Sequence, residues 1–363
     1  MKSFYLGDIE IKLPIIQGGM GVGISLSGLA SAVANEGGIG VISCAGLGLV
    51  YRKSSENYSE SCISGLKEEL RKAKKNTKGI IGVNIMVALT NFADMVKTSI
   101  TENVDVIFAG AGLPLDLPSY LTAESKTKLV PIVSSSRAAQ IICSKWQNKY
   151  NYLPDAIVVE GPKAGGHLGF KKNQIDDELY SLENILPSVL HVTASYKEQK
   201  DIPVIVAGGI YSGKDIHRFI EMGASGVQMG TIFVTTDECD ASMDFKKTYL
   251  DSVEKDLIII ESPVGMPGRA IDGEFIKNFK DGLEKPLTCA FHCIKTCDYL
   301  NSPYCIILAL FNASRGNMKK GYAFAGSNAH LSTKIRSVKD VIFTLKTDFL
   351  AAQNESRKNF VDN

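Results

Sequence analysis

The sequence predicts an α/β fold, a (β/α)8 TIM barrel with a C-terminal helical extension, from three observations. Eight short, β-branched and nearly continuously apolar runs recur within the first 230 residues. Gly or Pro follows these runs, and stretches with helical spacing lie between most of them. Strands that are covered on both faces are apolar throughout, and strands that alternate with helices indicate right-handed parallel βαβ units.

The elements follow in order along the chain. Strands are predicted at residues 13–17, 39–43, 80–85, 104–109, 130–133, 156–160, 204–207 and 227–230. Helical patterns fall at residues 26–35, 63–76, 135–149 and 213–222. An open doubly wound sheet is the competing arrangement, because a Gly-rich turn follows the first strand. That turn, residues 18–23, lacks the G-x-G-x-x-G spacing and an acidic partner, which favours the closed barrel.

Length and charge limit the class of protein. The 363 residues divide into a barrel at 1–234, a helical segment with a Gly-rich closing motif at 235–345, and a charged tail at 346–363. A net charge of +1 argues against a nucleic-acid surface. The N-terminus has no signal-peptide pattern, and no apolar run reaches 18 residues. We therefore expect a cytoplasmic protein with reduced thiols and no membrane partner.

Glycine gathers at the predicted C-terminal ends of the strands, where such barrels place their working groups. Gly208 and Gly209 follow the seventh strand, and Gly230 ends the eighth. Barrels often hold a phosphate at these two positions. Tight turns alone would also explain the glycines, but two such turns in consecutive positions favour a phosphate site. An isomerase or aldolase barrel without flavin would share both turns, yet Glu160 has no well-placed second carboxylate beside it.

One histidine stands apart from the other four. His167 lies in a Gly-dense loop, residues 160–169, directly after the sixth predicted strand. An imidazole in that place can exchange a proton near neutral pH, or can hold an anion when it is protonated. A Gly-rich turn that merely contains a histidine is the alternative, and the loop alone leaves both open.

Five stretches taken together resemble the nitronate monooxygenases, formerly called 2-nitropropane dioxygenases, which are related to the flavin-dependent enoyl-ACP reductases. The stretches are residues 14–20, 82–84, 164–167, 207–210 and 228–231, and the match spans about residues 13–233. The resemblance implies a flavoprotein oxidoreductase that binds the nucleotide FMN. It also implies that a small-molecule nitronate and oxygen are converted to a carbonyl compound and nitrite.

The resemblance also implies roles for single residues. His167 matches the family's active-site histidine. The FMN-binding residues would be Gln17, Gly18, Gly19, Met20, Asn84, Glu160, Gly165, Gly208, Gly209, Gln228, Met229, Gly230 and Thr231.

Two features bear on the choice between the branches of the family. Monooxygenases of this type often carry Gln at position 160, whereas the reductase branch tends to carry Glu. Glu160 therefore keeps an NAD(P)H-dependent reductase of enoyl thioesters as the alternative. Residues 321–329 resemble the closing motif of the monooxygenases and favour that branch. The oligomeric state stays open, with a homodimer as one candidate.

The last four of eight cysteines are Cys289, Cys293, Cys297 and Cys305, in the spacing C-x3-C-x3-C-x7-C. Thiolates bind iron–sulfur clusters and zinc. On a helix, however, the first three would share one face over about 12 Å, which is wide for one metal centre. We therefore expect no metal and a buried helix face that cysteine fills as a small apolar residue. Metal analysis would decide between the two.

Overall fold

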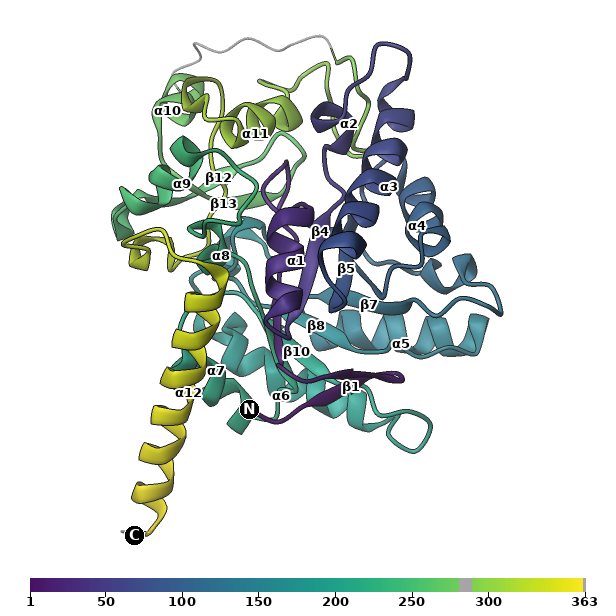
Figure 1. Ribbon diagram of the computed structural model, residues 1–363, viewed down its shortest axis with the longest axis vertical. Helices are drawn as coiled ribbons and strands as arrows, with labels where there is room; N and C mark the ends of the chain where they lie inside the picture. The colour runs from purple at the N-terminus through teal and green to yellow at the C-terminus, as the bar shows by residue number, and fades with distance from the viewer. Residues whose placement is uncertain (281–288, 362–363) are drawn as a thin grey trace.

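The computed structural model describes residues 1–280 and 289–361. Its centre is a closed barrel of eight parallel strands in the order β10-β11-β3-β4-β5-β6-β7-β8 (Figure 1). The strands are β3 (Ile15–Gln17), β4 (Ile39–Ser43), β5 (Ile80–Met86), β6 (Val106–Gly110), β7 (Lys128–Val133), β8 (Ile157–Glu160), β10 (Val204–Ala207) and β11 (Gly226–Met229). The predicted TIM barrel is confirmed, and each predicted strand corresponds to one of these eight.

Helices surround the barrel and connect its strands. They are α1 (Ser27–Asn35), α2 (Leu47–Val50), α3 (Tyr58–Asn76), α4 (Phe92–Thr101), α5 (Ser136–Tyr150), α6 (Leu182–Ala194), α7 (Gly213–Glu221) and α8 (Thr231–Val234). The start of α3 illustrates the local signals, because the side chains of Asn57 and Glu60 form a capping box there. Helix α1 packs against β4, and α6 packs against β8 and β10, which covers the outer face of these parallel strands.

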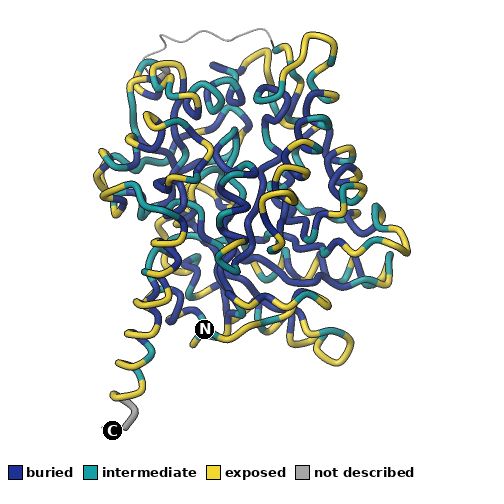
Figure 2. Tube along the Cα trace, in the orientation of Figure 1, coloured by how far each residue is buried: buried dark blue, intermediate teal, exposed yellow. Residues whose placement is uncertain are grey.

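A hairpin fills one end of the barrel. It consists of β1 (Phe4–Leu6) and β2 (Ile9–Ile11), which pair in antiparallel register. Leu6 and Ile11 are fully buried in the same cluster as the barrel-interior side chains of Phe108 and Val158. The barrel interior is accordingly a packed core, which Figure 2 shows as buried chain. The end of the barrel that remains open to a ligand is therefore the opposite one, at the C-terminal ends of the strands.

The chain between α8 and α12 covers that opposite end, and the chain then continues into α12 (Figure 1). The chain after α8 contains α9 (Met243–Leu250), β12 (Leu257–Glu261), β13 (Pro267–Ile271), α10 (Glu274–Lys280), α11 (Ile306–Ser314) and α12 (Val338–Val361). This segment was expected to be helical, but β12 and β13 form a hairpin that pairs with β9 (Gly166–His167). Helix α12 packs along α7 and extends past the body of the molecule (Figure 1). Among the described residues, no helix is both long and apolar enough to cross a membrane.

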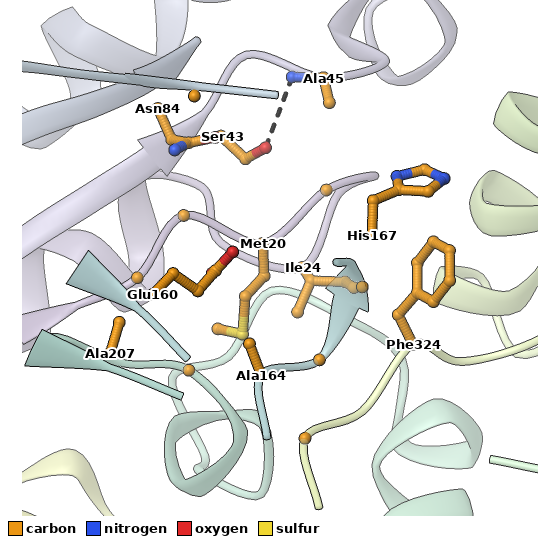
Figure 3. Close-up of a pocket in the computed structure, with 18 of the residues that line it drawn as sticks. Met20, Ile24, Ser43, Ala45, Asn84, Glu160, Ala164, His167, Ala207 and Phe324 are labelled. Atoms are coloured by element: carbon orange, nitrogen blue, oxygen red, sulfur yellow. Dashed lines mark hydrogen bonds between the residues drawn. The ribbon is translucent and has the colours of Figure 1, made fainter. Parts of the chain in front are cut away.

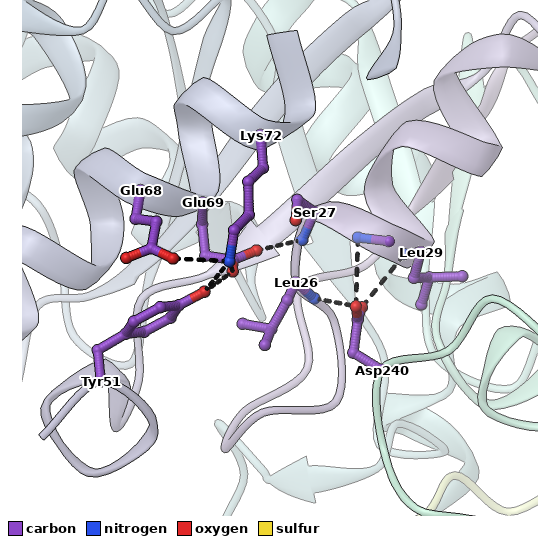
Figure 4. Close-up of polar contacts among 9 residues, drawn as sticks. Leu26, Ser27, Leu29, Tyr51, Glu68, Glu69, Lys72 and Asp240 are labelled. Atoms are coloured by element: carbon purple, nitrogen blue, oxygen red, sulfur yellow. Dashed lines mark hydrogen bonds and ion pairs between the residues drawn. The ribbon is translucent and has the colours of Figure 1, made fainter. Parts of the chain in front are cut away.

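Two carboxylates from distant parts of the chain bind the first turn of α1 (Figure 4). Asp240, which lies just beyond the barrel, accepts hydrogen bonds from the backbone N–H groups of Leu26 (2.8 Å), Leu29 (3.1 Å) and Gly28 (3.2 Å). Glu69 of α3 accepts a fourth from Ser27. The first N–H groups of a helix have no partner within it, so these contacts tie α1 to two other segments.

Candidate functional site

A cavity of about 290 Å³ opens at the C-terminal ends of the barrel strands. Its volume is close to the lower end of the range for small-molecule pockets, about 300–1,000 Å³. Most of the residues singled out from the sequence line it, namely Gly18, Gly19, Met20, Asn84, Glu160, Gly165, His167, Gly208, Gly209, Gln228, Met229, Gly230 and Thr231. The structure thus brings together residues from five strand ends, those of β3, β5, β8, β10 and β11, although their role as ligands of a cofactor stays a prediction.

The turns after β10 and β11 offer free backbone donors to this cavity. The N–H groups of Gly209, Ile210, Gly230 and Thr231 donate no hydrogen bond within the described part of the chain. Gly209 has a φ of +82°, and a Cβ placed on it would lie 2.8 Å from the Cβ of Lys163. Glycine is therefore required there for both its conformation and its size. Clustered free amides of this kind form an anion-binding concavity.

The Gly-rich closing motif, residues 321–329, lies directly over these turns. The N–H of Gly326 donates to Thr231 Oγ1 (3.1 Å), and Asn328 Nδ2 donates to the carbonyl of Gly209 (2.8 Å). A Cβ on Gly165 would lie 2.5 Å from the backbone nitrogen of Gly326, so the two loops touch through their main chains. Phe324 and Gly326 also line the cavity. The motif therefore forms part of the cavity wall.

His167 is held in place by the β12–β13 hairpin. It pairs with Gly268 of β13, and its Nε2 lies 2.7 Å from the hydroxyl oxygen of Ser262. The ring meets Phe324 edge to face with ring centres 5.0 Å apart. Burial lowers the pKa of His167 to about 4, so the imidazole is neutral at physiological pH. A neutral imidazole can accept a proton or donate one hydrogen bond, but it brings no positive charge to a bound anion.

Glu160 ends β8, and its side chain points into the same cavity as His167 (Figure 3). Burial raises the pKa of this carboxyl to about 7. Both its neutral and its ionised forms are therefore populated near neutral pH. A carboxyl in a cavity with a perturbed pKa is typical of a functional site.

Aliphatic side chains from outside the barrel line another part of the cavity. Ile306, Ile307 and Leu310 come from α11, and Ile294 comes from the segment before it. The backbone of Ile294 forms an isolated bridge with Leu89, which also lines the cavity. We call these five residues the aliphatic wall. It provides an apolar surface for a hydrocarbon part of a substrate.

Gln17 lies outside the cavity, and Ser262 and the aliphatic wall were not predicted from the sequence. Gln17 does not line the cavity, because its fully buried side chain accepts a hydrogen bond from the N–H of Val41 (3.0 Å) and donates to the carbonyl of Gly18. Gln17 therefore braces the barrel between β3 and β4. Ser262 and the aliphatic wall could not be recognised from the sequence. No local pattern marks them, since 95 residues separate Ser262 from His167.

Comparisons with known proteins show which family this chain resembles over most of its length. A family model described as nitronate monooxygenase matches residues 2–348. A probable nitronate monooxygenase of Staphylococcus haemolyticus is 27% identical over 311 residues, which cover 75% of this chain and 79% of the relative.

The chain is also similar to two proteins with other names. A protein of Mycobacterium tuberculosis named (3aS,4S,5R,7aS)-5-hydroxy-7a-methyl-1-oxo-octahydro-1H-indene-4-carboxyl-CoA dehydrogenase is 28% identical over 274 residues, covering 76% of this chain and 67% of the relative. The solved structure of FabK from Thermotoga maritima has a TM-score of 0.74 at 25% identity and covers 96% of both chains. The family model spans nearly the whole sequence, the barrel and its covering segment alike, and the chain therefore belongs to the nitronate monooxygenase family.

Proposed function

We propose that this protein is an FMN-dependent nitronate monooxygenase that converts an alkyl nitronate and oxygen to a carbonyl compound and nitrite. The observation that carries the proposal is the position of His167. Its neutral imidazole lies in one cavity with the unpartnered amides of two glycine turns and with the aliphatic wall. We include a cytoplasmic location in the proposal.

The donors in the cavity fit a flavin mononucleotide. The free N–H groups of Gly209, Ile210, Gly230 and Thr231 suit the phosphate, which needs several converging donors. Asn84 of β5 and Glu160 of β8 line the same cavity and would be the residues that hydrogen-bond the ring system. When bound, FMN would supply the redox chemistry by taking electrons from the nitronate and passing them to oxygen.

The protein's own contribution is to bind and orient the nitronate. His167 can donate a hydrogen bond to a nitro oxygen from one ring nitrogen, while Ser262 fixes the orientation of the ring through Nε2. If a neutral nitroalkane enters instead, the unprotonated imidazole can accept the proton from its α-carbon. The aliphatic wall removes water from the alkyl chain and favours apolar substrates.

A reductase of enoyl thioesters that uses NAD(P)H is the second candidate. Glu160 favours it, because the carboxyl stands where the monooxygenase branch often carries an amide. The similarity to a protein named as a carboxyl-CoA dehydrogenase supports it as well. In that reaction His167 would lie beside the acyl carbonyl or the nucleotide.

Anaerobic mixing separates the two candidates. The FMN-loaded protein is mixed with a preformed nitronate and, separately, with NADH and NADPH, while flavin absorbance is followed. We expect the nitronate alone to bleach the flavin, and nitrite to accumulate once oxygen is admitted. Rapid bleaching by a pyridine nucleotide, with no response to the nitronate, would establish the reductase instead. A protein that takes up no FMN would overturn both.

A further inference from the structure

Four cysteines gather beside the cavity in a segment that is not helical. The expectation of a helix through Cys289, Cys293 and Cys297 is wrong, because residues 289–305 form turns and irregular chain. His292, which lies between Cys289 and Cys293, has a φ of +44°. An α-helix requires a negative φ, so no helix can run through these two cysteines. The wide spacing that a helix would impose on these thiols therefore does not apply.

The turns bring the four thiols together. Cys293 and Cys305 pack in one apolar cluster, and Cys297 packs in the adjoining one, with Ile294 belonging to both. The N–H of His292 donates to the sulfur of Cys289 (3.3 Å), which keeps that thiol beside Cys293. The four cysteines thus lie in two adjoining apolar clusters and in the turn beside them.

We propose that Cys289, Cys293, Cys297 and Cys305 are the ligands of an iron–sulfur cluster. All four are free thiols, and three of them are partly exposed, so the site is accessible. Four Cys thiolates are the usual ligand set of both [2Fe–2S] and [4Fe–4S] clusters. Among the described residues, no group of three His, Cys, Asp or Glu could hold a single metal ion, which argues against a mononuclear zinc site here. It does not depend on the proposed function.

The cluster site adjoins the aliphatic wall. Ile294 directly follows Cys293, and Ile306 directly follows Cys305 and opens α11. The N–H of Thr90 donates to the carbonyl of Cys293 (3.1 Å), which ties this segment to the loop after β5. A cluster bound by these cysteines would join the two segments that supply the wall.

Metal and sulfide analysis tests the proposal on the wild-type protein. The full chain is purified anaerobically, reconstituted with ferrous iron and sulfide, and freed of unbound metal. We expect two or four iron atoms per chain with an equal amount of acid-labile sulfide. Chemical reduction should also give a paramagnetic resonance signal distinct from that of a flavin radical. Iron and sulfide near zero, or zinc without sulfide, would overturn the proposal whether or not FMN binds.

Variants locate the cluster. Cys293→Ala and Cys297→Ala should each lose most of the iron and sulfide, because a cubane or rhombic cluster with a missing ligand is labile. Cys143→Ala is the matched control, since Cys143 is a buried free thiol on α5, far along the chain from the four ligands. Equal iron in all three variants would contradict the assignment of the ligands. Circular dichroism identifies any variant that has failed to fold, and the wild-type stoichiometry then decides alone.

Discussion

The imidazole Nε2 of His167 and the hydroxyl oxygen of Ser262 lie 2.7 Å apart, in two chain segments that the β9–β13 ladder holds together. Ser262 touches the ring and not the cavity, so it acts on the reaction by positioning His167. We expect Ser262→Ala to lower kcat about three- to tenfold, the value of one hydrogen bond of about 1 kcal/mol.

Two controls for Ser262→Ala distinguish a loss of His167 positioning from a loss of folding. FMN content and KM should stay near wild type in Ser262→Ala, and Ser262→Thr should restore most of kcat because it keeps the hydroxyl.

His167→Ala should keep FMN but lose about a hundredfold or more in kcat, the range of a general acid–base group. Unchanged turnover in His167→Ala would remove the role assigned to the imidazole.

Glu160 predicts how the reaction depends on pH. Its pKa of about 7 means that the carboxyl becomes ionised as pH rises through neutrality. A nitronate is an anion, so an ionised Glu160 in the same cavity repels it. We expect kcat/KM for a preformed nitronate to fall as pH rises through about 7. His167, with a pKa of about 4, stays neutral over that range and should add no second ionisation.

The Glu160→Gln variant provides the control. Gln has nearly the same shape but no titrating proton, so the fall near pH 7 should disappear while activity at lower pH is retained. A wild-type fall that persists unchanged in Glu160→Gln would assign the ionisation to another group. Steady-state rates over about four pH units, with the enzyme saturated in FMN, measure the difference.

Gly209 tests the phosphate site. Its φ of +82° disfavours any side chain, and a Cβ would meet the Cβ of Lys163 at 2.8 Å. Gly209→Ala should therefore shift the turn and weaken FMN binding by at least about tenfold, measured by fluorescence titration of the apoprotein. Gly273→Ala is the control, because nothing lies within 4 Å of a Cβ at that position. If the two variants bind FMN with equal affinity, the FMN phosphate does not bind at the Gly209 turn.

Much of the barrel could be predicted from the sequence because its strands are covered on both faces. The run at 39–43 coincides with β4 (Ile39–Ser43), and the run at 204–207 coincides with β10 (Val204–Ala207). A strand with no solvent-exposed face is apolar throughout, so its first and last residues can be located where polar residues or glycine begin. The glycines after these strands could also be recognised, because few other residues adopt the backbone conformations of a tight turn at a strand end.

The covering segment could not be predicted in this way. Strand β9 is only two residues long and lies within a Gly-rich loop, so it has no alternation to detect. Ser262 meets His167 only because β13 pairs with β9, which is a tertiary contact. The helix predicted through the cysteines was wrong for a different reason. Their spacing of four suggested a helix, but the left-handed conformation of His292 determines the local path of the chain.

Asp240 links the covering segment to the barrel, and its removal should destabilise the fold. Its carboxylate accepts three N–H groups at the start of α1, those of Leu26, Gly28 and Leu29 (Figure 4). Asp240→Ala leaves these donors without an acceptor, which costs about 1–3 kcal/mol. We expect a lower midpoint of urea unfolding with an unchanged m-value. Asp251→Ala, at an exposed carboxylate just after α9, should leave the midpoint in place. Equal midpoints for both variants would mean that water replaces Asp240 at the helix start without loss.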